Sequence, residues 1–264
     1  MSSLFRRYFI CTLLMMAPHA RAESAVRVCM DPDNLPFSSS SREGFDNKIA
    51  VLLAKDMQRH VVFVWSRARR GFLREQFNKG ACDALMGVPQ GMKHVLTTEP
   101  YYRSSYVFVT RRDNHLKLSR FDDPAIGHRR IGLQILEEDY SPPSLPLIRS
   151  GHAAQFVGFN SFGSDGSEIV HAVAEKRVGL SVVWGPLAGY YVAQQKVPLV
   201  ISAVRPAVDP SGIPFSYAIS IAVHQNDSLL AKELNAAIER NRAAIRKILS
   251  AYHVPLDEGF GTGL

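Results

Sequence analysis

Apolar and polar positions alternate in short blocks along the chain, and these blocks predict an α/β fold. Short β-branched and aromatic runs bounded by Gly, Pro, Asn or Asp are typical of strands, whereas apolar residues three and four apart are typical of helices. Helical patterns begin near Asp46, which is expected to cap its helix, and near Phe72. A strand–helix–strand–helix–strand order predicts a parallel, helix-covered sheet. The expected strands are 26–30, 61–65, 84–88, 106–110, 130–134, 155–159, 180–184 and 217–223.

The same pattern predicts two lobes, the first of them discontinuous. The order of elements up to residue 109 repeats in shorter form further along the chain. The polar segment 111–124 and the Pro/Gly-rich segment 206–214 interrupt the strands, and we interpret both as crossings between lobes. One long amphipathic helix, carrying Leu230 to Leu249, follows the last strand. The predicted fold is a two-lobed type II arrangement with a ligand cleft between two helix-covered mixed sheets. Lobe 1 is formed by residues 23–109 and 216–264, and lobe 2 by residues 110–215.

The first 22 residues have the pattern of a secretory signal peptide. Arg6 and Arg7 precede the apolar run Tyr8–Ala17, and Ala20 and Ala22 form a small-residue cleavage site. The alternative is a buried N-terminal helix. The run is shorter than the roughly 20 residues of a membrane span, and no later run is long enough. We therefore expect a periplasmic protein with no membrane span after cleavage at residue 22.

The net charge and the cysteines indicate which partners and which cellular compartment to expect. The whole chain carries a formal net charge of +7, but its basic residues are dispersed, so no nucleic-acid partner is expected. Cys11 lies in the predicted signal peptide, which leaves Cys29 and Cys82. Two cysteines in an oxidising compartment favour one disulfide, with two buried free thiols as the alternative.

Motifs for catalysis and metal binding are absent from the sequence. The nine histidines are scattered, with no pair at the spacing of a local metal site, and no nucleophile elbow, C-x-x-C or P-loop occurs. We therefore expect no metal, no cofactor and no catalytic residue. Because catalytic groups are recognised by geometry, an enzyme such as a dehydratase remains an alternative. It requires a buried carboxyl with a raised pKa in the cleft, for which Asp31 and Glu99 are candidates.

Several side chains are expected to line the cleft because they follow predicted strands. The loop Asp31–Phe37 is one such segment, with a plain turn as the alternative. Cations at Arg67, Arg69 and Arg70 precede a helix start, where the helix dipole opposes them. They are interpreted as an anion or partner site, or else as solvated or paired charges. Trp184 ends a strand and is either a cleft residue or a core residue. The predicted cleft set is Asp31, Asn34, Phe37, Arg69, Arg70, Pro89, Tyr101, Arg103, Tyr106, Gln134, Trp184 and Tyr190.

These residues also carry a resemblance to a known family. The Asn-Lys-Gly-x-x-Asp segment 78–83, the Pro-Tyr-Tyr triplet 100–102 and the order of elements resemble the family 3, type II periplasmic solute-binding proteins over essentially the whole mature chain. Four longer segments are similar to the MxaJ/XoxJ group, the binding proteins associated with methanol dehydrogenases that contain pyrroloquinoline quinone (PQQ). These segments are 27–38, 69–72, 96–109 and 183–191.

The resemblance implies a non-catalytic accessory of a PQQ-dependent alcohol dehydrogenase, acting in its maturation or activation. One departure bears on the ligand. Amino-acid-binding members hold the ligand carboxylate with an Arg near the positions occupied here by Gly91 and Met92, where Lys93 is the nearest cation. They hold the ammonium group with an acid where this chain has Gly185. A zwitterion needs both charges paired. The alternative function is therefore an ABC-transporter substrate-binding protein for a small solute that is not a standard amino acid.

Overall fold

The computed structural model describes residues 25–67, 72–136, 139–160 and 164–257. The predicted signal peptide, and Arg69 and Arg70, lie outside these residues. The helices are α1 Phe45–Asp56, α2 Ser144–Arg149, α3 Glu168–Ala174, α4 Gly185–Val192, α5 Ser228–Arg240 and α6 Arg242–Ala251. The strands are β1 Ala25–Met30, β2 Asp33–Asn34, β3 Ser38–Ser39, β4 His60–Trp65, β5 Ala84–Pro89, β6 Leu96–Thr97, β7 Tyr102–Arg111, β8 Ile131–Leu136, β9 Asp139–Tyr140, β10 Phe156–Asn160, β11 Leu180–Trp184, β12 Leu199–Ala203 and β13 Ser216–Val223. A π-helical segment, η1 Leu73–Phe77, and four short 3₁₀ segments complete the described elements: η2 Arg112–Asn114, η3 Pro124–Ile126, η4 Ala153–Gln155 and η5 Ser164–Ser167.

Two sets of parallel strands share one topology. In the first set β1 lies between β4 and β5 and pairs with both in parallel, which confirms the predicted parallel unit. In the second set β8 lies between β10 and β11 and again pairs with both in parallel. An antiparallel strand follows each set, β13 beside β5 and β7 beside β11. The second half of the chain therefore repeats the strand order of the first.

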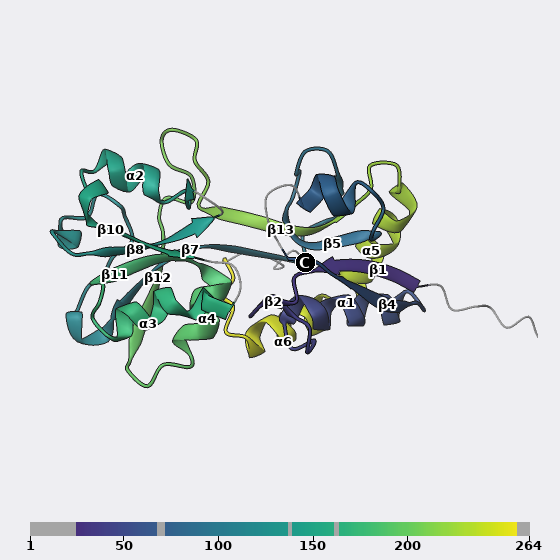
Figure 1. Ribbon diagram of the computed structural model, residues 1–264, viewed down its shortest axis with the longest axis horizontal. Coiled ribbons are helices and arrows are strands. Elements are labelled where there is room, and N and C mark those ends of the chain that lie inside the picture. The colour runs from purple at the N-terminus through teal and green to yellow at the C-terminus, as the bar shows by residue number, and fades with distance from the viewer. Residues whose placement is uncertain (1–24, 68–71, 137–138, 161–163, 258–264) are drawn as a thin grey trace, which may run out of the picture.

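Strands β7 and β13 join the two sets. Residues 102–105 of β7 pair with β13, whereas residues 106–111 pair with β11 and β12. Figure 1 shows the outcome: α2, α3 and α4 lie with β8, β10, β11 and β12, and α1 and α5 lie with β1, β4 and β5. Between these two groups run β7 and β13.

The connections therefore run through extended strands and not through the polar segments that the sequence suggested. Within segment 111–124, Leu118 and Phe121 are buried in a core that also contains Leu133 of β8. Ile213 of segment 206–214 packs against the same core. Both segments thus belong to the second group, because a few apolar side chains within an otherwise polar segment are enough to anchor it.

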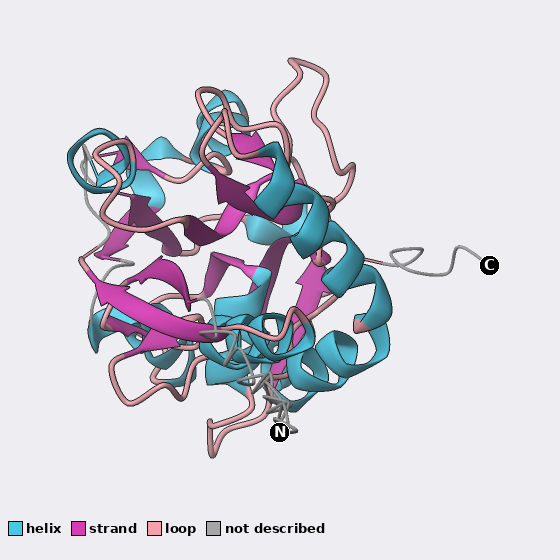
Figure 2. Ribbon diagram, turned by 90° about the vertical axis from the view of Figure 1, so that its right-hand side faces the viewer, coloured by secondary structure: helices cyan, strands magenta, loops and turns pink. Residues whose placement is uncertain are grey.

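Each group has its own buried core. In the first, Phe45 and Ile49 of α1 pack with residues of β1, β5, β13, α5 and α6. In the second, neighbouring residues of β7 point to opposite faces of the sheet, so Phe108 enters one core and Val109 enters another. Figure 2 shows strands in the interior with helices around them. No helix within the described ranges is long and apolar enough to cross a membrane.

The C-terminal helix differs from expectation. The predicted long C-terminal helix is divided at Asn241 into α5 and α6. The side-chain amide of Asn241 donates to Oδ1 of Asp56 at 2.9 Å and to the carbonyl of Ala237 at 2.8 Å, so tertiary contacts favour the break. The Pro-rich segment after β9 contains the short helix α2, since proline is tolerated in the first turn of a helix.

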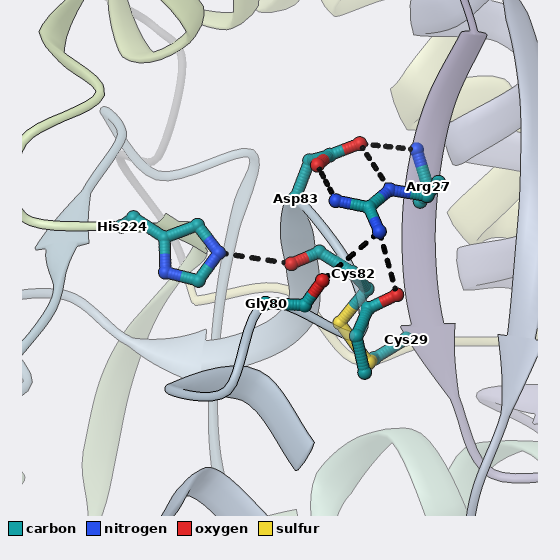
Figure 3. The surroundings of a disulfide bond; sticks show 7 residues. Arg27, Cys29, Gly80, Cys82, Asp83 and His224 are labelled. Atoms are coloured by element: carbon teal, nitrogen blue, oxygen red, sulfur yellow. Dashed lines mark hydrogen bonds and ion pairs between the residues drawn. A yellow bond between two sulfur atoms is a disulfide. The ribbon is translucent and has the colours of Figure 1, made fainter.

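Cys29 and Cys82 form the expected disulfide, with a Cα–Cα separation of 5.6 Å (Figure 3). The bond joins β1 to the turn before β5. Beside it, the Asp83 carboxylate accepts a hydrogen bond from the Arg27 backbone N–H at 2.8 Å and forms an ion pair with the Arg27 guanidinium at 2.5 Å. His224 hydrogen-bonds to the Cys82 carbonyl at 2.9 Å. Covalent, ionic and hydrogen-bonded links therefore fix the end of this turn to the first sheet.

Candidate functional site

A cavity of about 580 Å³ lies between the two groups of elements. Both groups contribute to it because the carboxyl ends of β1, β5, β8 and β11 meet there, as ligand sites in parallel sheets do. Its walls are mainly apolar and aromatic. The lining residues are Cys29, Met30, Asp31, Asn34, Phe37, Ser38, Asp46, Ser66, Phe72, Leu85, Met86, Gly87, Val88, Pro89, Tyr102, Tyr106, Gln134, Leu136, Pro142, Trp184, Leu187, Tyr217 and Ile219.

Most of the predicted cleft residues with a described position lie in this wall. They are Asp31, Asn34, Phe37, Pro89, Tyr106, Gln134 and Trp184. They come from distant parts of the sequence and share a position at or just after the carboxyl end of a strand, or on the connecting strand β7. Arg69 and Arg70 lie outside the described residues, and Arg67 is exposed.

Three predicted cleft residues lie elsewhere. Tyr101 is buried behind the wall, where its hydroxyl binds a carboxylate. Arg103 follows Tyr102 on β7, and successive side chains of a strand point to opposite faces, so Arg103 points away from the cavity. Tyr190 of α4 stacks on Tyr252 with ring centroids 5.7 Å apart. A residue that neighbours a lining residue in the sequence does not therefore have to line the cavity itself, because strand alternation and helix packing decide the direction of each side chain.

The loop after β1 serves both as a turn and as part of the wall. The Asp31 carboxylate accepts from the Asp33 backbone N–H at 2.8 Å, and the Ser38 hydroxyl donates to the Asp31 carbonyl at 2.8 Å. The backbone N–H of Phe37 donates to the Asn34 carbonyl at 2.9 Å. These bonds hold Asn34 and Phe37 at the cavity, so the two sequence interpretations of this loop are compatible.

Trp184 is the centre of an aromatic corner. Its ring meets Tyr106 at 5.4 Å and 64°, and Tyr217 at 5.8 Å and 72°. Its backbone N–H donates to Oε1 of the buried Gln134 at 2.6 Å, which joins β11 to β8 at the cavity. The sequence did not single out Tyr217; the available signal was strand alternation, which places Tyr217 on the same face of β13 as Ile219.

Asp46 is another lining residue that the sequence did not assign to the site. Gly44, not Asp46, is the N-cap of α1, and Asp46 lies in the first turn with 4% of its surface exposed. Its Oδ1 accepts a hydrogen bond from the Tyr101 hydroxyl at 2.7 Å. Burial raises the pKa of Asp46 to about 7, although the Tyr101 hydrogen bond lowers it. The cavity wall thus contains a carboxyl that titrates near neutral pH.

Neither of the two positions that the resemblance assigns to holding an amino acid places a charge in the described wall. Gly185 begins α4 directly against β7, and a Cβ at this position would lie 2.6 Å from the Ser105 carbonyl oxygen. An acidic side chain therefore has no room at the position where amino-acid-binding members carry one. Gly91, Met92 and Lys93 do not line the cavity, and the described lining residues include no Lys, Arg or His.

The described residues bear on metal binding and on the enzymatic alternative in different ways. They contain no group of three or more His, Cys, Asp or Glu side chains that could hold a metal ion. Glu99, one of the two carboxylates considered for catalysis, is exposed and lies outside the cavity, whereas Asp31 lies in its wall. The carboxyl with a raised pKa is Asp46 instead.

Comparisons with known proteins agree over nearly all of the described chain. Residues 26–254 match the model of the bacterial extracellular solute-binding proteins, family 3. The protein MoxJ of Paracoccus denitrificans is 29% identical over 92% of this chain and 93% of its own length.

Two solved structures extend the comparison. The crystal structure of MxaJ from Methlophaga aminisulfidivorans superimposes with a TM-score of 0.78 at 28% identity, covering 88% of this chain and 100% of that one. The periplasmic binding protein XoxJ from Methylobacterium extorquens gives a TM-score of 0.71 at 30% identity, covering 88% and 99%.

Proposed function

Because the chain belongs to the bacterial extracellular solute-binding proteins of family 3 and has the α/β fold of type II periplasmic binding proteins, we propose that it is a non-catalytic periplasmic accessory of a PQQ-dependent methanol or alcohol dehydrogenase. It acts in the maturation or activation of that enzyme. The observation that carries the proposal is the similarity, over almost the full length, to MoxJ, MxaJ and XoxJ. The segments that resemble the dehydrogenase-associated group support the same partner.

The arrangement of elements supports a binding function. In the proposal, residues 23–109 with 216–264 form one lobe and residues 110–215 the other, with β7 and β13 as the connections. The cavity between them takes residues from both groups of elements, so a bound molecule or a docked partner can influence the angle between the lobes.

Direct association with the dehydrogenase tests the accessory function. The mature chain, residues 23–264, is immobilised and exposed to purified dehydrogenase with and without its quinone, followed by cross-linking and mass spectrometry. Retention of either form, with cross-links to described surface lysines, is expected. An amino-acid-binding member of family 3 serves as the control for non-specific retention. Failure of both enzyme forms to associate contradicts the proposal.

A second function, favoured by the cavity itself, is that of a receptor that delivers a small solute to an ABC transporter. A volume of about 580 Å³ falls within the range of small-molecule sites. A ligand that binds the folded state raises the melting temperature, so a screen of metabolites by thermal shift is the measurement. An unchanged melting temperature with cationic, neutral and anionic metabolites counts against this function. It does not contradict the accessory function.

A further inference from the structure

The cavity combines two buried carboxyls, Asp31 and Asp46, with an aromatic corner, and the accessory function uses none of these groups. The Asp31 carboxylate accepts a hydrogen bond from the Asp33 backbone within the turn after β1, so Asp46 is the carboxyl considered for a ligand. Asp46 reaches the cavity from the first turn of α1. The aromatic corner consists of Trp184 at the end of β11, Tyr106 of β7 and Tyr217 of β13. Negative charge beside aromatic faces is the combination by which proteins recognise organic cations.

The rings of the aromatic corner face different directions. Tyr106 and Tyr217 both meet Trp184 in edge-to-face geometry, at 64° and 72°, so the ring planes differ in orientation, and all three residues line the cavity. A cation near several aromatic faces gains attraction from each, and Trp provides the strongest attraction. The corner lies where the two groups of elements meet, since β11 belongs to one group and β13 connects both.

Tyr102 links the aromatic corner to Asp46. It lines the cavity, and its ring meets that of Tyr101 at 5.0 Å. Burial and the Asp46 charge raise the pKa of the Tyr102 hydroxyl, and a hydrogen bond with the Trp184 side chain lowers it. Asp46, Tyr102 and Trp184 all line this one cavity of about 580 Å³, a volume in the range of small-molecule sites.

The charge balance of the wall favours a cation over other ligands. Asp46 accepts a hydrogen bond from Tyr101 and forms no ion pair with any described residue. A buried carboxylate without a counter-charge is costly, and a cationic ligand supplies that charge. The described lining has no Lys, Arg or His, so an anion or the carboxylate of a zwitterion finds no cation there.

The apolar wall further favours a methylated ammonium group. A primary ammonium has three N–H donors that each need an acceptor. A quaternary ammonium has none and presents methyl groups to side chains such as Met30, Met86 and Ile219. We propose that the cavity binds a small organic cation of the tertiary or quaternary ammonium class, held by Asp46 and the aromatic corner. This inference rests on the small-solute function of the cavity proposed above and not on the dehydrogenase partner.

Three isosteric probes test the charge requirement. Isothermal titration calorimetry on the mature protein uses choline as the cation, 3,3-dimethyl-1-butanol as the neutral isostere and 3,3-dimethylbutanoate as the anion. Choline is expected to bind at least roughly tenfold more tightly than the alcohol, with no binding of the anion. Equal affinity for choline and the alcohol, or no binding of choline, overturns the inference.

Variants assign the effect to the named residues. Asp46→Asn preserves the shape of the side chain and removes its charge, and it is expected to lower choline affinity at least roughly tenfold. Tyr217→Leu, at a half-buried position, tests the aromatic corner if Trp184→Leu does not fold, as judged by circular dichroism. Asp122→Asn, in an exposed ion pair with Arg120, is the matched control with unchanged affinity. Wild-type affinity in Asp46→Asn overturns the role of the carboxyl.

The outcomes separate this inference from the proposed functions. A neutral or anionic metabolite that shifts the melting temperature, together with inert choline, leaves solute binding standing and overturns the cation site. Choline binding without capture of the dehydrogenase supports the cation site and contradicts the accessory function.

Discussion

The Tyr101 hydroxyl, buried behind the cavity wall, donates a hydrogen bond of 2.7 Å to Oδ1 of Asp46, which lines the cavity. Both side chains are 4% exposed, so this bond lies in a region of low dielectric. Burial, with the Asp46 charge as a second cause, raises the pKa of Tyr101 well above its usual range. The proton between the two groups therefore belongs to Tyr101, and Asp46 is the member of this pair that titrates near neutral pH.

Stability should depend on pH through Asp46. Its pKa is about 7 in the folded protein and 3.8 as the ordinary value, so the folded state binds more protons than the unfolded state between pH 4 and 7. The contribution of Asp46 to the free energy of unfolding therefore falls as pH rises through this window and levels off above pH 7. The loss is at most about 4 kcal/mol.

Urea unfolding of the wild type and Asp46→Asn at several pH values measures this effect. Because the other titrating groups are common to both proteins, the difference between the two curves isolates Asp46. The stability of the wild type should decline relative to Asp46→Asn from pH 4 to pH 7. Parallel curves across this window contradict the prediction.

Tyr101→Phe should make Asp46 harder to ionise. The variant removes the hydrogen bond that favours the carboxylate, so the pKa of Asp46 rises further. The change in the carboxyl ¹³C chemical shift with pH measures that pKa directly. A hydrogen bond to a charged group is worth about 1.5–3 kcal/mol, so the variant should lose roughly that much stability above pH 7 and less below it. A titration midpoint that stays in place or moves down would argue against this account.

Removing the disulfide should destabilise the protein by an amount that grows with the logarithm of the length of the loop it closes. Cys29 and Cys82 are 53 residues apart, for which the loop-closure model gives roughly 4 kcal/mol. The double variant Cys29→Ser, Cys82→Ser should therefore unfold at lower urea concentration. Wild-type protein treated with a reductant is the control and should show the same shift. A loss below about 1 kcal/mol would mean that the ion pair of Arg27 and Asp83 and the packing hold this turn without the bond.

Trp184 should report ligand binding by fluorescence. The chain has two tryptophans, and Trp65, on the edge strand β4, is 36% exposed, whereas Trp184 contributes to the cavity wall. In Trp65→Phe all indole emission comes from the cavity, so a bound cation should change its intensity. Trp184→Phe keeps the exposed indole and should show a longer emission wavelength and no response. A response carried by Trp65 alone would place the ligand outside the cavity.

Asn241→Ala should weaken the packing of the C-terminal helices on α1. The variant removes the amide that donates to Asp56 and Ala237. Asp56 keeps its ion pair with Arg240, so a loss of about 1 kcal/mol is expected, and not the larger loss of a fully orphaned carboxylate. Arg242→Ala, whose partner is the exposed Glu239, is the matched control and should change stability by less.

Local patterns predicted most of the elements and part of the site. The strand over 180–184 agrees with β11 residue for residue, because a β-branched run between a glycine and a Gly-Pro pair has few alternatives. The same reasoning placed Asp31, Asn34 and Trp184 at the ends of strands, and these residues line the cavity. The two cysteines left after the signal peptide suggested a disulfide, and the structure contains that bond.

Other features depend on contacts between distant segments. Asp46 was predicted to cap a helix, but Gly44 is the cap and the carboxyl lies in the cavity wall, because Asp46 is packed beside Tyr101, 55 residues away. Tyr101, Arg103 and Tyr190 lie near lining residues in the sequence yet point elsewhere.

The sequence by itself determined the strands that pair in parallel, the approximate start of the first helix, the cysteine pair and the family resemblance, and it predicts an export signal at the N-terminus. These features follow from local periodicity and residue type, which act over a few neighbouring residues. Only the tertiary structure decided that β7 and β13 connect the two groups, that α5 and α6 are separate, and that a buried carboxyl meets an aromatic corner in one cavity. Such features arise from side-chain direction and long-range packing, and periodicity within one segment does not contain them.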